Sequence, residues 1–337
     1  MLLHFTKMEG CGNDYVYVDG AAEKEVLSQL TQAEKEEMIR KLSDRHFGIG
    51  GDGVIFINPS DVADFEMEMY NADGSRGEMC GNGIRCVGKY VYDHGMTGGR
   101  KNFTVESFKV PRYLTVTETD EDGRAEILRV NMGAPILEPA KIPADPNKNA
   151  MQSPEALAGE IPVKALEREN STETSGKPED TLIRYPLYVE KTKDLPALCE
   201  FSKEDGKDGI WHVTCVSMGN PHAVVFIDNT DALPIEQIGP GFEHHPMFPN
   251  RTNTEFVEVI DRSYVKMRVW ERGSGETLAC GTGCCATGVA CILNGLTEDK
   301  LTVEVLGGKI VIEWDRAENM LYMTGPARAV FEGTVDI

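Results

Sequence analysis

The sequence feature that most constrains the fold is an internal repeat with an offset of 200 residues. The segment MEMYNADGSRGEMCGNGIRCVG at 67–88 aligns without gaps with MRVWERGSGETLACGTGCCATG at 267–288, which pairs Cys80 with Cys280. Each copy runs from a strand-like stretch through a glycine-bearing turn and Cys-Gly-x-Gly into a helix-like stretch. Two copies in one register predict a duplicated unit and therefore two similar domains.

Length and charge narrow the class of protein. The 337 residues suffice for about two domains of ordinary size. A net charge of −21 argues against nucleic acid or an anionic membrane as the main partner. No apolar run reaches the roughly 18 residues of a membrane span, and the N-terminal MLLHFTKMEGCGND does not resemble a signal peptide. We therefore expect a cytoplasmic protein.

The hydrophobic pattern predicts many short strands and few long helices. Helices are expected at 31–47, about 82–93 and about 282–293. Strands are expected at 15–19, 54–58, 65–70, 102–107, 113–119, 125–131, 212–218, 223–227, 255–260, 264–270, 301–306, 309–314 and 320–325. This mixture is typical of the α+β class.

Two further segments carry structural predictions. The region 134–210 concentrates Pro, Glu, Lys and Ser, which is typical of an exposed insertion around some pairing strands. GIGGDG at 48–53 matches the glycine pattern of dinucleotide sites, but it leaves a predicted helix and enters a predicted strand, which is the wrong order. We interpret it as a structural turn near the site.

The nine cysteines could indicate disulfides, a metal site or reactive thiols. Their odd number in a chain without a secretory signal argues against a disulfide framework. Without a Cys-x-x-Cys pair a zinc site has little support, and no metal ligands are predicted. Most of the cysteines are expected to be small buried apolar side chains, namely Cys86, Cys199, Cys215, Cys284, Cys285 and Cys291.

Cys80 and Cys280 stand at the start of predicted helices. There the helix dipole and free backbone N–H groups favour the thiolate and can lower the pKa of a thiol. The same N–H groups can hold a carboxylate. Two facing copies would place two thiols on either side of a small anionic substrate. That arrangement can remove a proton from one face of a carbon and return one to the other.

The chain resembles the diaminopimelate epimerases, a family of cofactor-independent amino-acid epimerases. The matching stretches run in the family's order along nearly the whole chain: GCGNDY (10–15), RHFGIGGDG (45–53), YNADGSRGEMCGNGIRC (70–86), SMGNPHAVVF (217–226), RTNTEFV (251–257) and ERGSGETLACGTG (271–283). The resemblance implies two pseudo-symmetric domains, each a mostly antiparallel sheet or barrel around a central helix. We expect the first domain to span 1–129 plus 329–337 and the second to span 130–328, with the insertion at about 134–210.

The resemblance also implies the reaction. It is the epimerisation of LL-2,6-diaminopimelate to the meso form by thiol and thiolate proton transfer at the α-carbon, in lysine and peptidoglycan precursor biosynthesis. No pyridoxal phosphate or other cofactor is expected. Diaminopimelate is the expected small-molecule partner, and a homodimer is the expected assembly. Some family members have glutamine where this chain has Gly53, at a distal substrate contact.

Residue roles follow from the same resemblance. It implies Cys80 and Cys280 as the two bases, with Glu271 and His222 tuning their charge. The residues expected to bind substrate are Asn13, Asn71, Gly81, Asn82, Asn220, Asn253, Glu271, Arg272, Gly281 and Thr282. Among these, Glu271 and Arg272 would contact the α-amino and carboxylate groups. Neutral amides suit a substrate end that carries both an ammonium and a carboxylate, because they donate and accept without shifting a thiol pKa.

Three alternatives remain open from the sequence. A proline or hydroxyproline racemase shares the paired cysteines, and a PhzF-like isomerase shares the fold but lacks the thiol pair. A redox sensor or binding protein could instead use Cys80 and Cys280 as a switchable disulfide. Comparing turnover of diaminopimelate with turnover of proline would distinguish an epimerase of this family from a proline racemase. Redox-dependent partner binding without turnover would support the redox sensor.

Overall fold

The computed structural model describes residues 1–77, 79–149, 181–192, 202 and 205–337. Its helices are α1 (Lys24–Leu27), α2 (Gln32–Ser43), α3 (Gly81–Asp93), α6 (Ile235–Glu243) and α7 (Gly281–Leu293), with short turns η1 (Pro139–Lys141), η2 (Pro146–Lys148), η4 (Glu190–Thr192) and η5 (Lys207–Gly209). Among the described helices, none has the length and apolar character needed to cross a membrane.

The strands of the N-terminal half are β1 (Leu2–Gly10), β2 (Asn13–Asp19), β3 (Gly53–Asn58), β4 (Phe65–Asn71), β5 (Asn102–Ser107), β6 (Val110–Thr119) and β7 (Ala125–Gly133). They are followed by β8 (Tyr185–Tyr188), β9 (Ile210–Ser217), β10 (Pro221–Phe226), β11 (Asn253–Asp261), β12 (Tyr264–Glu271), β13 (Gly275–Thr277), β14 (Lys300–Val305), β15 (Gly308–Asp315), β16 (Met320–Pro326) and β17 (Arg328–Asp336).

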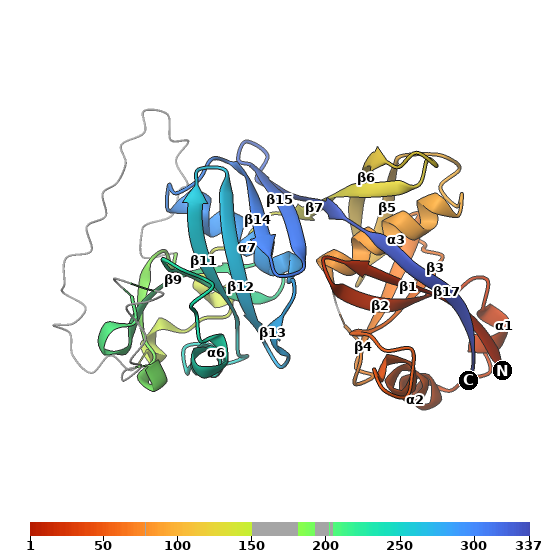
Figure 1. The fold of residues 1–337 in the computed structure, drawn as a ribbon, viewed down its shortest axis with the longest axis horizontal. Helices are drawn as coiled ribbons and strands as arrows, with labels where there is room; N and C mark the ends of the chain where they lie inside the picture. The colour runs from red at the N-terminus through yellow and green to blue at the C-terminus, as the bar shows by residue number, and fades with distance from the viewer. Residues whose placement is uncertain (78, 150–180, 193–201, 203–204) are drawn as a thin grey trace.

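These strands form one continuous sheet that wraps around α3 in one half and α7 in the other (Figure 1). Most pairs are antiparallel, but β2–β3 and β4–β5 are parallel, and so are β10–β11 and β12–β14 at the matching places of the other half. The halves join where β7 pairs with β16. The repeated pairing pattern confirms the pseudo-symmetric α+β fold predicted from the sequence repeat.

Two glycines of the repeat allow each central helix to approach its sheet. A Cβ on Gly88 of α3 would lie 2.7 Å from side-chain atoms of Leu114 and Leu128. A Cβ on Gly288 of α7 would lie 2.5 Å from Ile312. Because contacts this short require the surroundings to move, both helices depend on glycine for their close packing.

The prediction that most cysteines are buried apolar side chains is confirmed for those that the structure describes. Cys86 on α3, Cys215 on β9, and Cys284, Cys285 and Cys291 on α7 are all buried. α7 is apolar on nearly all sides, as expected for a helix enclosed by strands. Cys199 lies outside the described residues.

Several element boundaries differ from the prediction. The expected helix 31–47 ends at Ser43, because the backbone of Asp44 has an extended conformation. The carboxylate of Asp44 accepts hydrogen bonds from the backbone amides of His46 and Phe47. Elements that the sequence pattern did not predict are α1, α6, β1, β8, β13 and β17. The thirteen strands that were predicted are present, with ends displaced by a few residues.

The predicted insertion at 134–210 is partly integrated into the C-terminal half. Its strand β8 pairs with β9, and Ile142, Leu187 and Val189 belong to a buried apolar cluster with Trp211. Residues 150–180, 193–201 and 203–204 of this segment lie outside the described ranges.

Candidate active site

The two matched cysteines occupy the same structural position in their halves. Cys80 is the N-cap of α3 and Cys280 is the N-cap of α7, and both have extended backbone angles. Each sulfur accepts a hydrogen bond from a first-turn amide, from Gly83 at 3.2 Å and from Gly283 at 3.4 Å. The sequence prediction that both cysteines lie at helix N-termini is therefore confirmed.

The two helix ends meet at the junction of the halves. A Cβ on Gly281 would lie 3.1 Å from the Cα of Gly81, so the backbones are almost in contact. The side-chain amide of Asn82 donates to the carbonyl of Ala279 at 3.2 Å, which ties the two ends together. Arg85, fully buried, donates to the carbonyl of Gly81 at 3.2 Å and to Oδ1 of Asn82 at 3.0 Å. This contact brings both cysteine motifs into one site.

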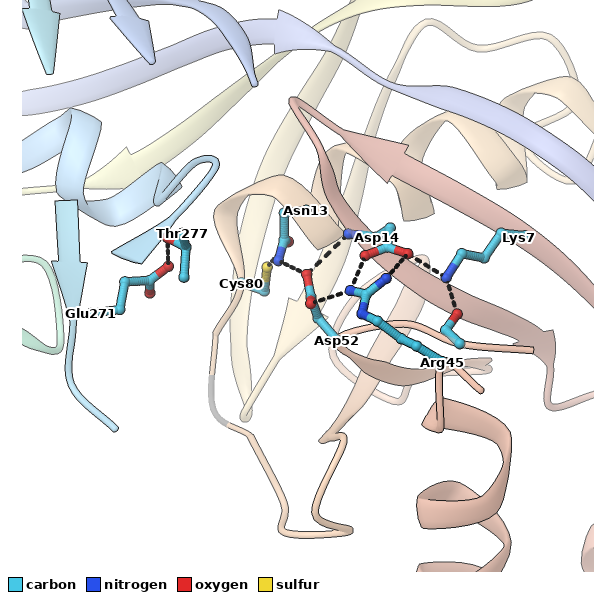
Figure 2. Close-up of polar contacts among 9 residues, drawn as sticks. Lys7, Asn13, Asp14, Arg45, Asp52, Cys80, Glu271 and Thr277 are labelled. Carbon is cyan, nitrogen blue, oxygen red and sulfur yellow. Dashed lines mark hydrogen bonds and ion pairs between the residues drawn. The ribbon is translucent and has the colours of Figure 1, made fainter. Parts of the chain in front are cut away.

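A network of hydrogen bonds and ion pairs lies next to Cys80 and fixes the side chains around it (Figure 2). Cys80 Sγ donates to Oδ1 of Asn13 at 3.1 Å, and Nδ2 of Asn13 donates to Asp52 at 2.7 Å. Arg45 lies 2.8 Å from Asp52 and 2.7 Å from Asp14. Burial and the neighbouring Asp14 raise the pKa of Asp52. The carboxylate of Asp52 thus orients the Asn13 amide with its oxygen toward the thiol.

Glu271 approaches the site from the opposite half. It lies at the end of β12, across from Cys80 in Figure 2, and Thr277 Oγ1 donates to its Oε1 at 2.5 Å. Burial raises the pKa of Glu271, although hydrogen bonds from Thr277 and Cys280 act to lower it. Thr282 Oγ1 lies 3.5 Å from Cys280 Sγ. The structure therefore places the carboxyl group of Glu271 beside Cys280.

Burial and nearby carboxylates, more than the helix ends, determine the pKa values of the two thiols. Burial raises the pKa of Cys80 to about 11, and the negative charges of Glu271 and Asp52 act in the same direction. Burial, Glu271 and Glu255 raise the pKa of Cys280 well above its usual value. The amide hydrogen bonds do lower both values, but desolvation and carboxylates outweigh them. Both thiols are thus protonated near neutrality.

His222 and Asn220 connect to Cys280 through Thr282. His222 on β10 is fully buried, and its Nε2 lies 3.1 Å from Oδ1 of Asn220. Nδ2 of Asn220 donates to Oγ1 of Thr282 at 3.2 Å. On its other side, His222 Nδ1 lies 2.7 Å from Glu255. The structure therefore brings the predicted residues His222, Asn220 and Thr282 together beside Cys280.

Three side chains that the sequence predicts to bind substrate make local contacts in this structure. Asn253 Nδ2 donates to the carbonyl of Pro221 at 3.0 Å, and its Oδ1 accepts from the amide of Arg272 at 2.9 Å. The guanidinium of Arg272 is exposed and donates to the carbonyl of Asn250 at 3.1 Å. Asn71 donates within its own turn at the end of β4. For these residues the structure shows loop-stabilising contacts at the edge of the site.

Some residues of the site were not predicted. Three of them lie within motifs quoted above, namely Asp52 in GIGGDG, Thr277 in ERGSGET and Glu255 in RTNTEFV. Their place in these motifs was the one sign in the sequence that they could belong to the site. Arg85 lies within the stretch YNADGSRGEMCGNGIRC, but its position on the buried side of the helix could not be read from that motif. GIGGDG is confirmed as a turn near the site, because it leads from α2 to Asp52 and β3.

Gly53 has no space for the glutamine found in some family members. Its φ is 155°, and a Cβ there would lie 1.9 Å from the carbonyl oxygen of Tyr70 and 2.8 Å from the ring of Tyr15. Gly53→Gln is expected to lower the free energy of unfolding by more than about 3 kcal/mol, because strain and overlap add. Gly123→Gln is the control, since Gly123 has a φ of 78° and no neighbour within 4 Å. Urea unfolding should show a clearly smaller loss for the control, and equal losses would contradict the steric argument.

The fold is shared with solved structures of amino-acid racemases and related isomerases. A PhzF-family phenazine biosynthesis protein from Bacillus anthracis superposes with a TM-score of 0.63 over 100% of both chains, at 17% identity. A probable proline racemase from Agrobacterium radiobacter superposes with a TM-score of 0.61 over 99% of this chain and 92% of the other, at 13% identity. At such identities the likeness defines the fold class.

Sequence comparison defines the family. The model of the family described as diaminopimelate epimerase matches residues 5–138 and 214–330. The diaminopimelate epimerase of Acetivibrio thermocellus is 47% identical over 335 residues, 99% of both chains. That of Methanococcus maripaludis is 44% identical over 99% of this chain and 100% of its own. The chain belongs to the diaminopimelate epimerase family, and its segment 139–213 lies within the length that it shares with these relatives.

Proposed function

We propose that this protein epimerises LL-2,6-diaminopimelate to meso-2,6-diaminopimelate by proton transfer between Cys80 and Cys280 at the α-carbon. The observation that carries the proposal is the meeting of the two cysteine-capped helix ends through Gly81 and Gly281. The names of the relatives supply the substrate. One thiolate removes the α-proton, and the thiol on the opposite face returns a proton, so the roles exchange with the direction of reaction.

The charges of the site favour a substrate with an α-ammonium group. Burial raises the pKa of Cys80, and the negative charges of Glu271 and Asp52 raise it further. An ammonium bound at Glu271 would offset that negative field and lower the pKa of the nearby thiols. Substrate binding would then create the thiolate where it is needed. In this proposal the mechanism needs no pyridoxal phosphate, because the two thiols supply both proton transfers.

The N-terminal ends of the two helices would also stabilise the carbanionic transition state. First-turn amides, including those of Asn82 and Thr282, would bind the α-carboxylate and stabilise the charge that develops on it. Such interactions are strong only where water is excluded. Cys280 is 6% exposed and Asn82 is 1% exposed, which supports a dry environment on this side of the site, whereas Cys80 and Glu271 are half-buried.

The proposal is tested by incubating the purified protein with LL-diaminopimelate in deuterated water. We expect meso product that carries deuterium at the inverted α-carbon, measured by chiral chromatography and mass spectrometry. Turnover of proline but not of diaminopimelate would instead support the racemase alternative. Redox-dependent partner binding without turnover of either would support the sensor.

Glu271→Gln should separate activity from stability. Burial raises the pKa of Glu271 in the folded protein, so its ionised form destabilises the fold, and this cost grows as the pH rises through the folded pKa. We expect the variant to have a higher melting temperature than the parent at neutral pH, with the difference disappearing in acid. Epimerase activity should fall about 100-fold, because the cation site is lost.

Glu276→Gln on the adjoining hairpin is the control for that substitution. Glu276 forms an ion pair of 2.7 Å with Arg268, so neutralising it removes a favourable contact. Its melting temperature should stay unchanged or fall, with activity retained. A lower melting temperature for Glu271→Gln at neutral pH would contradict the proposed cost of the buried carboxylate.

We further propose that the strands around α3 and those around α7 are the two domains, 1–129 plus 329–337 and 130–328. The return of β17 to pair with β1 supports this division.

A homodimer is supported by exposed apolar side chains on β17, such as Val330 and Phe331, and light scattering would test it. The free thiols of Cys80 and Cys280 support a reducing, cytoplasmic location. Nucleic acid is not a proposed partner, given the net charge of −21.

A further inference from the structure

The two halves differ in the residue that lies beneath the start of the central helix. In the N-terminal half, a Cβ on Gly83 would lie 2.8 Å from Cδ1 of Ile55 on β3. In the C-terminal half, a Cβ on Gly283 would lie 2.7 Å from Oε1 of Glu255 on β11. Ile55 and Glu255 are each fully buried. The duplicated fold therefore places a carboxyl group where its other copy has an aliphatic side chain.

Glu255 has one hydrogen-bond partner among the described residues. Its Oε1 lies 2.7 Å from Nδ1 of His222, which is also fully buried, while its buried Oε2 has no partner within the described part of the chain. A buried carboxyl group with one unsatisfied oxygen is unfavourable compared with an apolar side chain. Since Ile55 shows that an apolar residue fits this position in the fold, packing does not account for Glu255.

A chain of hydrogen bonds runs from Glu255 to the thiol. His222 Nε2 lies 3.1 Å from Oδ1 of Asn220, and Nδ2 of Asn220 donates to Oγ1 of Thr282 at 3.2 Å. Thr282 Oγ1 in turn lies 3.5 Å from Cys280 Sγ. Because Oδ1 of Asn220 can only accept, Nε2 of His222 must carry its hydrogen. Each member of the chain thus fixes the orientation of the next.

We propose that Glu255 is a positioning residue for Cys280. It holds the His222 ring with Nε2–H directed at Asn220, and so fixes the Asn220 amide and the Thr282 hydroxyl beside the thiol. This inference rests on the proposed function and adds a residue that acts through His222.

The other half reaches the same result by a different route. There, Asp52 accepts from the Asn13 amide, and the amide oxygen of Asn13 accepts directly from the Cys80 thiol. Each thiol is therefore aligned through an asparagine that a carboxyl group orients. In the C-terminal half, His222 stands between the carboxyl group and the asparagine. Glu255 is the counterpart in role, though not in position, of Asp52.

The test compares Glu255→Leu and Glu255→Gln in the full-length protein with diaminopimelate as substrate. Glu255→Leu removes the hydrogen-bond partner of Nδ1 and should lower kcat about 100-fold, with KM changed less than threefold. Glu255→Gln keeps a polar group that can form a hydrogen bond with Nδ1 and should recover kcat to within about tenfold of the parent. Ile55→Leu, at the matching buried position, is the control and should retain full activity. Parental kcat in folded Glu255→Leu would overturn the proposal.

A double-mutant cycle distinguishes positioning from general damage to the fold. If Glu255 acts through His222, Glu255→Leu combined with His222→Gln should be no slower than His222→Gln alone. Fully multiplicative losses would overturn the proposal. Imidazole ¹⁵N spectra, with His222 assigned by its absence in His222→Gln, provide a readout without turnover.

The spectra also separate failure of this inference from failure of the proposed function. Glu255→Leu should shift the His222 nitrogen signals, while Ile55→Leu should leave them unchanged. A parent protein that shows the Glu255-dependent His222 signals but does not turn over diaminopimelate would refute the proposed function alone. Unchanged His222 signals in Glu255→Leu, with an active parent, would refute the positioning role alone.

Discussion

Replacing either Cys80 or Cys280 with alanine is expected to reduce epimerisation at least about 1000-fold, because each variant lacks a proton donor or acceptor on one face of the α-carbon. The remaining thiol should still exchange the α-proton of one stereoisomer with solvent, without inverting it. Incorporation of deuterium into unreacted LL- or meso-diaminopimelate would show which thiol serves which face. Full epimerisation by either variant would refute the two-base mechanism.

Cys284→Ala is the matched control for this result. Cys284 lies on the same helix as Cys280 and is fully buried, but it packs in the core of the C-terminal half. Its replacement should cost a small amount of stability while kcat is retained. A comparable loss of activity in Cys284→Ala would show that the loss in Cys280→Ala reflects repacking of α7.

Gly281→Ala is expected to lower activity by pushing the two helix ends apart. The added Cβ would lie 3.1 Å from Cα of Gly81 and 3.2 Å from both N and Oδ1 of Asn82, and two of these three atoms are backbone. Contacts this short require the neighbouring backbone to give by a few tenths of an ångström, and a misplacement of about 1 Å can cost about 100-fold in rate. We therefore expect kcat/KM to fall by more than about tenfold, with a stability loss of about 1–3 kcal/mol.

Gly81→Ala provides the matched comparison. Its Cβ would lie 3.0 Å from the terminal methyl of Met323, which can rotate away, and 3.4 Å from Cα of Gly281. Its loss of activity should be less than about tenfold, since a flexible methionine adapts easily. Steady-state kinetics and thermal unfolding of both variants would check the difference, and equal effects would contradict the asymmetric contact.

The parts of the fold that followed a hydrophobic alternation could be predicted from the sequence. Some of the elements that were not predicted lack that signal. The strand β17 (Arg328–Asp336) is largely exposed, so its residues show no apolar face, and β13 (Gly275–Thr277) is too short to show a period. The helix α6 contains Pro240, a residue that normally argues against a helix interior.

The positions of the site residues could be predicted better than their electrostatics. The repeat and motifs placed Cys80 and Cys280 at helix N-termini, as the structure has them. The thiol pKa values, however, depend on burial and on carboxylates that the fold brings from distant strands, such as Glu271 and Glu255. A sequence does not display the sum of such contributions. For the same reason, the exposed guanidinium of Arg272 could not be foreseen.

The pairing of β1 with β17 has a consequence for synthesis on the ribosome. β1 opens the N-terminal half, yet its partner β17 is translated after β16 and the rest of the C-terminal half, and the pairs extend to Leu2 with Asp336. Until β17 has been synthesised, one edge of β1 in the nascent N-terminal half therefore stays unpaired, and an unpaired strand edge promotes aggregation. A premature stop before β17 would consequently damage the half of the protein that was made first.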